Sequence, residues 1–266
     1  MKLGVCLLML ASASDPLAKE HIPLLKKAGY DYAEVPLARL LELPEEELRQ
    51  YRELFRENGL PVEAFNNSIP TGLPMIGPDY CEETLRRYID RAVALAEFLG
   101  VKVITMCGPI RDWVPEGFEW EDGFGQYVEF LKMYADAAAP HGITLAIEPI
   151  NHEENGFIST VAEACRVIEA CGRSNITVVV DFYHFFKEND NWEGLLRVCK
   201  AAVSHVHYAA LPRRSFPLNG DEAQCRLVFE PFLKAGYIGR VSIEAHTQDP
   251  KQDLPETCTM VRGVLR

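Results

Sequence analysis

The sequence predicts an α/β fold, a single (β/α)8 TIM barrel that forms one domain over residues 1–266. Short apolar runs alternate with amphipathic segments eight times, at about 33 residues per unit, which is the size of one strand–helix step. At 266 residues the chain has a length at which such barrels commonly form one unit. A doubly wound open sheet is the competing fold, but no glycine-rich phosphate loop follows the first apolar run.

The expected strands are apolar runs rich in β-branched residues, as is typical of parallel strands that are buried on both faces. Several of these runs follow directly after a glycine, for example Gly100 and Gly142. Glycine adopts the left-handed conformation that closes many helices, so each of these glycines marks the end of a helix. We therefore expect strands at about residues 2–9, 31–35, 61–65, 101–106, 143–148, 176–181, 203–208 and 240–244.

Three segments carry signals for the start of a helix. Asp15 followed by Pro16 is typical of an N-cap with proline at the first helical position. Pro44 followed by Glu45–Glu47 places negative charge where the helix dipole favours it. Thr160–Glu163 has the pattern of a capping box. We expect helices to begin at these three places.

Further helices are predicted by the spacing of apolar residues. Apolar side chains recur every three or four residues over 85–96 and again over 127–138, which gives each segment one apolar face. The helical patterns near 192–200 and 251–265 are weaker. Together these segments supply the helices that a (β/α)8 barrel needs.

Composition and charge exclude several classes of protein. Hydrophobic residues make up 48% of the chain and charged residues 25%, a balance typical of globular domains. The apolar stretch Val5–Leu10 is far shorter than the roughly 20 residues of a membrane-spanning helix and lacks the flanks of a complete signal peptide. The net charge of −12 disfavours binding to nucleic acid. We expect neither a nucleic-acid partner nor a membrane partner.

The cysteines indicate a reducing compartment. The chain has 8 cysteines and no CxxC pair, so neither a disulfide scaffold nor a zinc ribbon is predicted. Cytoplasmic localisation is therefore expected.

Acidic and imidazole side chains stand at the ends of four consecutive predicted strands, namely Glu148, Asp181, His207 and Glu244. In (β/α)8 barrels the functional residues lie at these carboxyl ends, so the four side chains are expected to converge. Three converging carboxylates repel one another unless a cation neutralises them. Oxygen-rich ligands with one imidazole favour a divalent metal, with Mn2+ preferred and Mg2+ or Co2+ as alternatives.

The same strand ends carry motifs that resemble a known family. They are similar to those of the xylose isomerase-like TIM-barrel superfamily, and in particular of its sugar isomerase/epimerase branch, which contains the D-tagatose and D-psicose 3-epimerases. The resemblance follows the strand order of the whole chain, but its specific motifs lie within residues 147–244. The matching stretches are Ile147–Asn151, Val180–His184, His205–His207 and Ser242–Glu244.

The resemblance implies a metal-dependent isomerase or epimerase that acts on carbohydrates. Glu148, Asp181, His207 and Glu244 would be the metal ligands, and Glu148 and Glu244 would also be the catalytic acid/base pair. The implied reaction is epimerisation of a ketose at C3 through a metal-stabilised enediolate. The implied partners are a small-molecule sugar and further copies of the chain, as a dimer or tetramer.

Five residues are candidates for contact with the substrate. Glu154, His184 and Arg213 match, by their spacing from the ligands, positions that contact substrate in the ketose epimerases. Asn66, after the third strand, and Trp113, in the loop after the fourth, are placed to line the mouth of the barrel.

Two departures from the family pattern leave the identity of the substrate undecided. Ala209–Ala210 follow His207 where the epimerases often carry a polar or acidic residue, and Ala245–His246 follow Glu244 where proline is common. An enzyme similar to hydroxypyruvate isomerase or inosose dehydratase is therefore the alternative.

Two other classes are disfavoured. A nuclease similar to endonuclease IV would need histidines after the second and third strands, where this chain has Glu34 and Asn66. Glu34 ends the second strand and is a candidate for a further polar contact, although we interpret it first as a structural residue at a strand end. A non-catalytic binding protein is disfavoured by the intact set of four predicted ligands.

Overall fold

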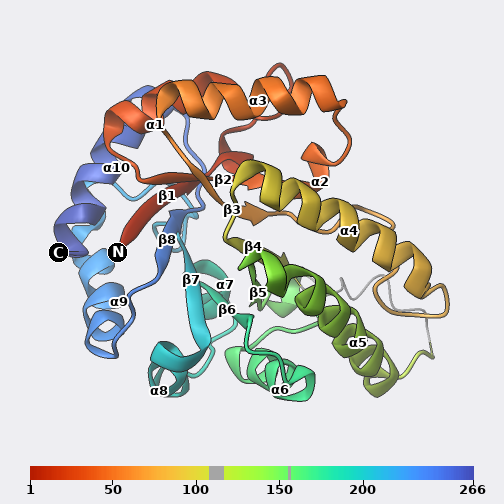
Figure 1. The fold of residues 1–266 in the computed structure, drawn as a ribbon. Helices are drawn as coiled ribbons and strands as arrows, with labels where there is room; N and C mark the ends of the chain where they lie inside the picture. Colours follow the sequence, from red (N-terminus) through yellow and green to blue (C-terminus); the bar gives the residue numbers. More distant parts are fainter. Residues whose placement is uncertain (108–116, 155–156) are drawn as a thin grey trace.

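The computed structural model describes residues 1–107, 117–154 and 157–266. Eight parallel strands close into a barrel in the order β1-β2-β3-β4-β5-β6-β7-β8, and helices surround it (Figure 1). The predicted fold class is therefore confirmed. The strands are β1 (Lys2–Cys6), β2 (Tyr32–Pro36), β3 (Val62–Asn66), β4 (Val103–Cys107), β5 (Thr144–Glu148), β6 (Ile176–Asp181), β7 (Val203–Tyr208) and β8 (Arg240–Ile243).

The helices pack their apolar faces against the outside of the barrel. Within the described ranges, no helix combines the length and the apolarity needed to cross a bilayer. The eight cysteines are free thiols. The α-helices are α1 (Ile22–Ala28), α2 (Leu37–Leu40), α3 (Glu45–Asn58), α4 (Glu82–Leu99), α5 (Trp120–Ala138), α6 (Val161–Cys171), α7 (Phe182–Lys187), α8 (Trp192–Ala202), α9 (Glu222–Lys234) and α10 (Pro250–Val264).

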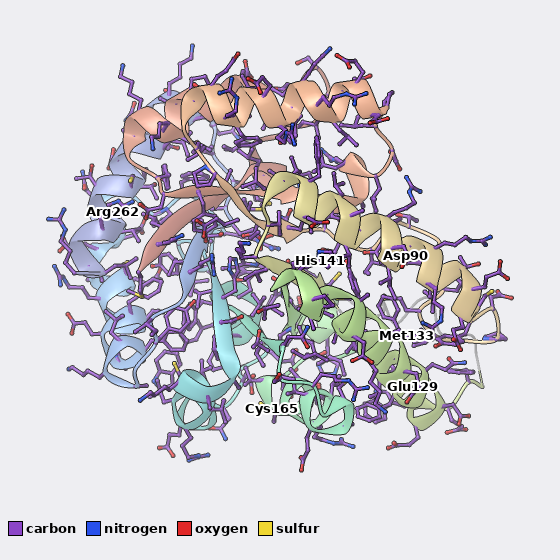
Figure 2. The ribbon with its side chains drawn as sticks, viewed as in Figure 1. Asp90, Glu129, Met133, His141, Cys165 and Arg262 are labelled. Atoms are coloured by element: carbon purple, nitrogen blue, oxygen red, sulfur yellow. The ribbon has the colours of Figure 1, made fainter. Side chains whose placement is uncertain are left out.

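The barrel closes where the last strand–helix unit meets the first. β8 pairs with β1, with Lys2 opposite Arg240 and Val5 opposite Ile243. On the outside, Arg262 of α10 (Figure 2) donates to the carboxylate of Asp31, at 2.8 Å, just before β2. Backbone pairing and this outer ion pair both connect the two ends of the chain.

Two of the three predicted helix starts are confirmed. α3 begins at Glu45 with Pro44 as its N-cap, and its first turn is acidic. α6 begins after Thr160, whose hydroxyl accepts the Glu163 N–H at 3.2 Å, while the Glu163 carboxylate accepts the Thr160 N–H at 3.1 Å. This reciprocal capping satisfies two N–H groups that the helix itself leaves without partners.

Two predictions for the amino-terminal part of the chain were wrong: the end of the first strand and the helix start at Asp15. The first strand was expected over residues 2–9 but ends at Cys6, and Leu7–Leu10 forms a 3-10 helix. A short apolar run is compatible with either element, so periodicity alone does not separate them. No α-helix begins at Asp15: its carboxylate accepts the N–H of Glu20, within the 3-10 helix Lys19–His21, at 2.9 Å, and α1 begins only at Ile22.

Tyr32 fills the interior of the barrel near the amino end of β2. Its ring is fully buried and its hydroxyl lies 2.7 Å from the Ser242 hydroxyl of β8. Gly4 of β1 faces this ring so closely that a Cβ at Gly4 would lie 2.4 Å from the ring Cζ. Because the ring is enclosed and hydrogen-bonded, it has little freedom to move away.

Substitution of Gly4 by alanine is expected to lower the free energy of unfolding by about 1–3 kcal/mol, because it overpacks the barrel interior. The matched control is Gly125→Ala, an exposed position of α5 with open space around it. That control is expected to raise stability by up to about 1 kcal/mol, since alanine favours a helix over glycine. Chemical denaturation measures both changes. Equal unfolding free energies for Gly4→Ala and wild type would contradict the tight-packing argument.

Candidate active site

Four side chains from consecutive strands converge at the carboxyl end of the barrel. Glu148 ends β5, Asp181 ends β6, His207 lies near the end of β7 and Glu244 follows β8. One potential ligand atom from each lies within 4.8 Å of those of the other three, and all four residues are buried. The structure thus brings together the four residues that the sequence singled out, while their roles stay predictions.

Hydrogen bonds orient the members of this quartet. His207 Nδ1 lies 2.7 Å from Glu148 Oε1 and 3.3 Å from Glu244 Oε2. Asp181 caps the start of α7, where its Oδ1 accepts the Tyr183 N–H at 2.7 Å. Asp181 Oδ2 faces His184 Nε2 at 3.5 Å and Arg214 Nη2 at 3.4 Å.

The charges of the quartet perturb one another. Burial raises the pKa of Asp181 well above its usual value, and the Glu244 carboxylate raises it further. Burial acts the same way on Glu244, but the nearby His207 holds its pKa well below the usual value. Burial opposes a charged His207, yet Glu34, Glu244 and Glu148 raise its pKa well above the usual value. Such a concentration of negative charge stabilises a bound cation.

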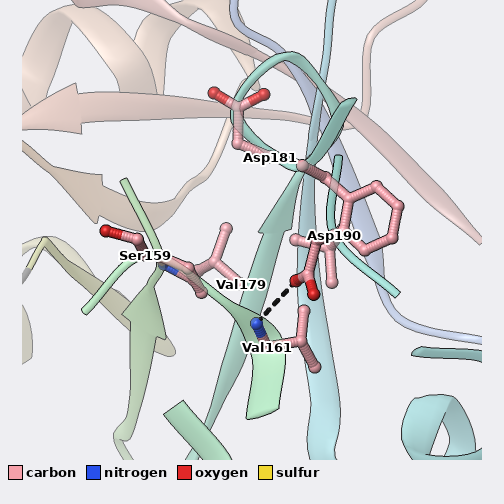
Figure 3. Close-up of a pocket in the computed structure, with 8 residues that line it drawn as sticks. Ser159, Val161, Val179, Asp181 and Asp190 are labelled. Carbon is pink, nitrogen blue, oxygen red and sulfur yellow. Dashed lines mark hydrogen bonds between the residues drawn. The ribbon is translucent and has the colours of Figure 1, made fainter. Parts of the chain in front are cut away.

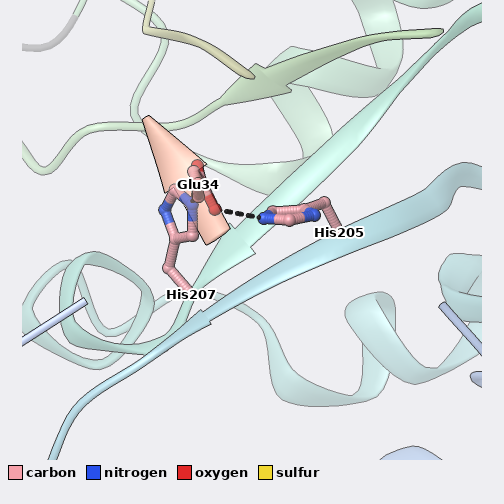
Figure 4. Close-up of side chains that lie close together, drawn as sticks. All are labelled: Glu34, His205 and His207. Atoms are coloured by element: carbon pink, nitrogen blue, oxygen red, sulfur yellow. Dashed lines mark hydrogen bonds and ion pairs between the residues drawn. The ribbon is translucent and has the colours of Figure 1, made fainter. Parts of the chain in front are cut away.

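Glu34 is a component of the site that the sequence interpretation missed. It was interpreted as a structural residue at a strand end, but its carboxylate contacts both histidines of β7 (Figure 4). His205 Nε2 lies 2.9 Å from Glu34 Oε2, and His207 Nε2 lies 3.0 Å from Glu34 Oε1. The His-X-His spacing was the available signal, because residues two apart in a strand face the same side.

The structure places two of the predicted substrate residues next to the quartet. His184 is buried, with its Nε2 3.5 Å from Asp181 Oδ2 and its Nδ1 2.6 Å from the Asn151 side-chain amide. Asn66 is buried, and its amide nitrogen donates to the Cys6 thiol. The Cys6 thiol in turn lies 3.7 Å from Glu244 Oε1, and the side-chain oxygen of Asn66 is buried without a hydrogen-bond partner among the described residues.

The other three residues that were predicted to contact the substrate have three different outcomes. Glu154 lies at the rim, where its Oε2 is 3.5 Å from Arg214. Trp113 lies outside the described residues. Arg213 points away from the site: it is exposed and donates to Asp221 at 2.8 Å.

Arg214, rather than Arg213, is the arginine that reaches the quartet. Its Nη2 lies 3.1 Å from Glu244 Oε2 and 3.4 Å from Asp181 Oδ2. Its guanidinium also stacks 4.6 Å from the centre of the Tyr183 ring. Arg214 has a left-handed backbone, with φ of 50°, and neighbouring residues in such a turn direct their side chains differently.

A small pocket with a cavity volume of about 10 Å³ lies beside β6 (Figure 3). Asp190 accepts the Val161 N–H there at 2.7 Å and so connects the start of α6 to the loop before α8. The Asp181 carboxylate points away from that contact in Figure 3. The pocket is lined by Asp181 and therefore borders the quartet, but it is too small to hold a sugar.

Comparison with known proteins identifies relatives of the same architecture. The 2-oxo-tetronate isomerase of Pectobacterium atrosepticum is 28% identical over 209 residues, which cover 76% of this chain and 78% of that protein. The D-psicose 3-epimerase of Agrobacterium fabrum is 25% identical over 240 residues, which cover 81% of this chain and 80% of that protein.

A solved structure supports the assignment of the fold. A D-psicose 3-epimerase crystallised in the presence of D-fructose superposes with a TM-score of 0.82 at 20% identity, covering 100% of this chain and 97% of that one. The family model of the xylose isomerase-like TIM barrel matches residues 22–263. Its relatives named above are isomerases and epimerases of small carbohydrate-like substrates. The chain therefore belongs to the xylose isomerase-like TIM barrel family.

Proposed function

We propose that this protein is a divalent-metal-dependent epimerase that inverts C3 of a ketose. The observation that carries this proposal is the convergence of Glu148, Asp181, His207 and Glu244 within 4.8 Å at the mouth of the barrel. The 25% identity to a D-psicose 3-epimerase supports the choice of a ketose.

The side chains of the quartet fit a divalent metal. Three carboxylates and one imidazole form an oxygen-rich donor set, which suits Mn2+ first, with Mg2+ and Co2+ as alternatives. All four residues would hold the ion. When bound, the ion supplies positive charge that stabilises the enediolate formed after loss of a proton beside the carbonyl.

Glu148 and Glu244 carry the proton transfers in this proposal. They come from β5 and β8, which are separated by two strands, so the two carboxylates approach a substrate from different sides. One glutamate removes the proton from C3 and the other delivers a proton to the opposite face of the same carbon. Delivery to the neighbouring carbon would give isomerisation instead.

In this proposal, three residues at the rim bind the rest of the sugar. His184 and Glu154 both contact the Asn151 side chain, which orients them toward the mouth. Arg214 lies between Glu154 and Glu244, at 3.5 Å and 3.1 Å, so its guanidinium is positioned to donate to substrate hydroxyls. Charged groups that donate to hydroxyls fix orientation as well as affinity.

Isomerisation of a 2-oxo acid is the second candidate, because a guanidinium at the rim could also pair with a substrate carboxylate. Arg214 occupies that position. The 28% identity to a 2-oxo-tetronate isomerase supports this alternative. A hydroxypyruvate isomerase of Escherichia coli is 28% identical over 169 residues.

Incubation with candidate substrates in deuterated water tests the two functions. We expect deuterium at C3 of D-psicose, D-tagatose or D-fructose, with the C3 epimer as product, as followed by NMR. Arg214→Ala is expected to lower kcat/KM for a ketose about 10-fold, since it removes a charged hydrogen-bond donor. Arg213→Ala, the matched control, is expected to have little effect because Arg213 faces Asp221.

The outcomes separate the candidates. Deuterium incorporation into hydroxypyruvate or 2-oxo-tetronate alone, with a larger loss in Arg214→Ala, would favour the 2-oxo acid isomerase. Absence of incorporation into any substrate, in metal-loaded protein, would contradict both.

We further propose a cytoplasmic homo-oligomer, a dimer or tetramer. The eight free thiols support a reducing compartment. Light scattering of the purified protein measures the number of subunits.

A further inference from the structure

Glu34 is a fully buried carboxylate held by two histidines of one strand. Its Oε2 lies 2.9 Å from His205 Nε2 and its Oε1 lies 3.0 Å from His207 Nε2 (Figure 4). All three side chains have no exposed surface. Each oxygen of this carboxylate therefore has its own imidazole partner.

The two nitrogens of His207 face different groups. Nε2 faces Glu34, whereas Nδ1 lies 2.7 Å from Glu148 and 3.3 Å from Glu244. An ionised carboxylate only accepts hydrogen bonds, so the Nε2 atom of His207 must carry the hydrogen in this contact. In a neutral imidazole the other nitrogen, Nδ1, then has the free lone pair. Nδ1 is directed at the carboxylates of the quartet, and its lone pair would serve a metal ion that replaces the hydrogen it shares with Glu148.

We propose that Glu34 is a positioning residue that fixes the tautomer and the ring orientation of His207 for metal binding. This inference rests on the proposed function, because it requires a metal held by the quartet. Metal-binding histidines commonly donate their second ring N–H to a carboxylate, which also makes the coordinating nitrogen more basic. Glu34 acts through His207 and does not itself belong to the quartet.

His205 and its neighbours keep Glu34 in place. His205 Nε2 lies 3.4 Å from the Ser242 hydroxyl, which in turn lies 2.7 Å from the Tyr32 hydroxyl. The Tyr32 ring packs against Gly4, so this end of the network is rigid. A carboxylate held at both oxygens by enclosed partners cannot rotate to release His207.

Glu34, His205 and His207 could themselves be a metal site, because their ligand atoms also cluster within 4.8 Å. Both Glu34 oxygens are already engaged by ring N–H groups, and His207 is shared with the quartet. We therefore favour the positioning role. Metal stoichiometry separates the two: one ion per chain is expected, and two ions per chain would overturn the inference.

Titration of Mn2+ into metal-free wild type and Glu34→Gln tests the role. The glutamine keeps the shape but presents an amide N–H to one of the histidines, which disturbs the tautomer. We expect the Kd for Mn2+ to rise about 10–100-fold. Glu34→Asp, which retains the charge, is expected to recover part of the affinity. Circular dichroism melts confirm that each variant is folded.

Glu63→Gln is the matched control. Glu63 is a buried carboxylate of β3 that pairs with Lys2 and lies 2.8 Å from Arg240, both at the start of their strands. The Glu63→Gln substitution removes a buried negative charge, as Glu34→Gln does, but at the amino end of the barrel, opposite the quartet. We expect a lower melting temperature but an unchanged Kd for Mn2+.

Proton NMR of the Co2+-loaded protein gives a readout that a purely structural role would not change. A coordinated imidazole shows a shifted, exchangeable N–H signal, and in wild type the His207 N–H should exchange slowly because Glu34 holds it in a buried contact. In Glu34→Gln this signal should be lost or exchange faster.

Each outcome is decisive. If wild type binds one metal and Glu34→Gln binds it within twofold, with an unchanged N–H signal, the positioning role is wrong and the proposed metal site stands. If wild type binds no divalent metal, the proposed function fails and this inference fails with it.

Discussion

Removal of divalent metal by exhaustive chelation should abolish epimerisation, and addition of Mn2+ should restore it. The reason is electrostatic: a proton beside a carbonyl is too weakly acidic for an unaided carboxylate, and the negative charge that develops needs a nearby cation. Three buried carboxylates cluster with His207 and could hold that cation. This loss should be the largest of those predicted, at several orders of magnitude in kcat/KM.

Metal analysis of the chelated protein and progress curves with each ion measure the effect. The circular dichroism spectrum is the control, since the barrel should persist without the ion. We expect Mn2+ to restore more activity than Mg2+ or Co2+. Full activity in protein shown to be free of metal would contradict the mechanism.

Glu148→Gln and Glu244→Gln should each lower kcat by about 10²–10⁴-fold, because an amide cannot accept the proton that the carboxylate takes up. Both residues are also in the metal cluster, so the rates must be measured at saturating Mn2+. The control is Glu153→Gln, an exposed glutamate after β5 that pairs with Lys187 at 3.1 Å. That control should keep nearly the wild-type rate.

Solvent exchange distinguishes the roles of the two glutamates. Each variant retains one base, and that base faces one side of the substrate. We therefore expect each variant to exchange the C3 proton of one epimer with deuterated water, and the two variants to prefer opposite epimers. Wild-type turnover in both variants would exclude the two-carboxylate mechanism, and exchange of the same epimer by both would contradict the assignment of opposite faces.

The sequence predicted most of the fold because each strand–helix step carries its own local signal. Thr160 and Glu163 form the expected capping box, and the strands from β2 to β8 begin and end within about two residues of the expected positions. The two wrong predictions also rested on local sequence patterns. Leu7–Leu10 continue an apolar run without continuing the strand, and Asp15 contacts the short 3-10 helix Lys19–His21 instead of capping an α-helix. In both cases short-range patterns fit two structures, and packing chose between them.

The convergence of Glu148, Asp181, His207 and Glu244 could be predicted without a structure, because the parallel order of strands brings every carboxyl end to the same rim. The other side chains around these four residues could be identified only from the tertiary structure. Arg213 and Arg214 are adjacent and chemically identical, so only the backbone turn selects the one that faces the carboxylates.

Glu34 is a similar case, separated by 171 residues from His205. A contact over such a distance leaves no periodicity in the sequence, and it exists only because barrel closure places β2 and β7 around one shared interior.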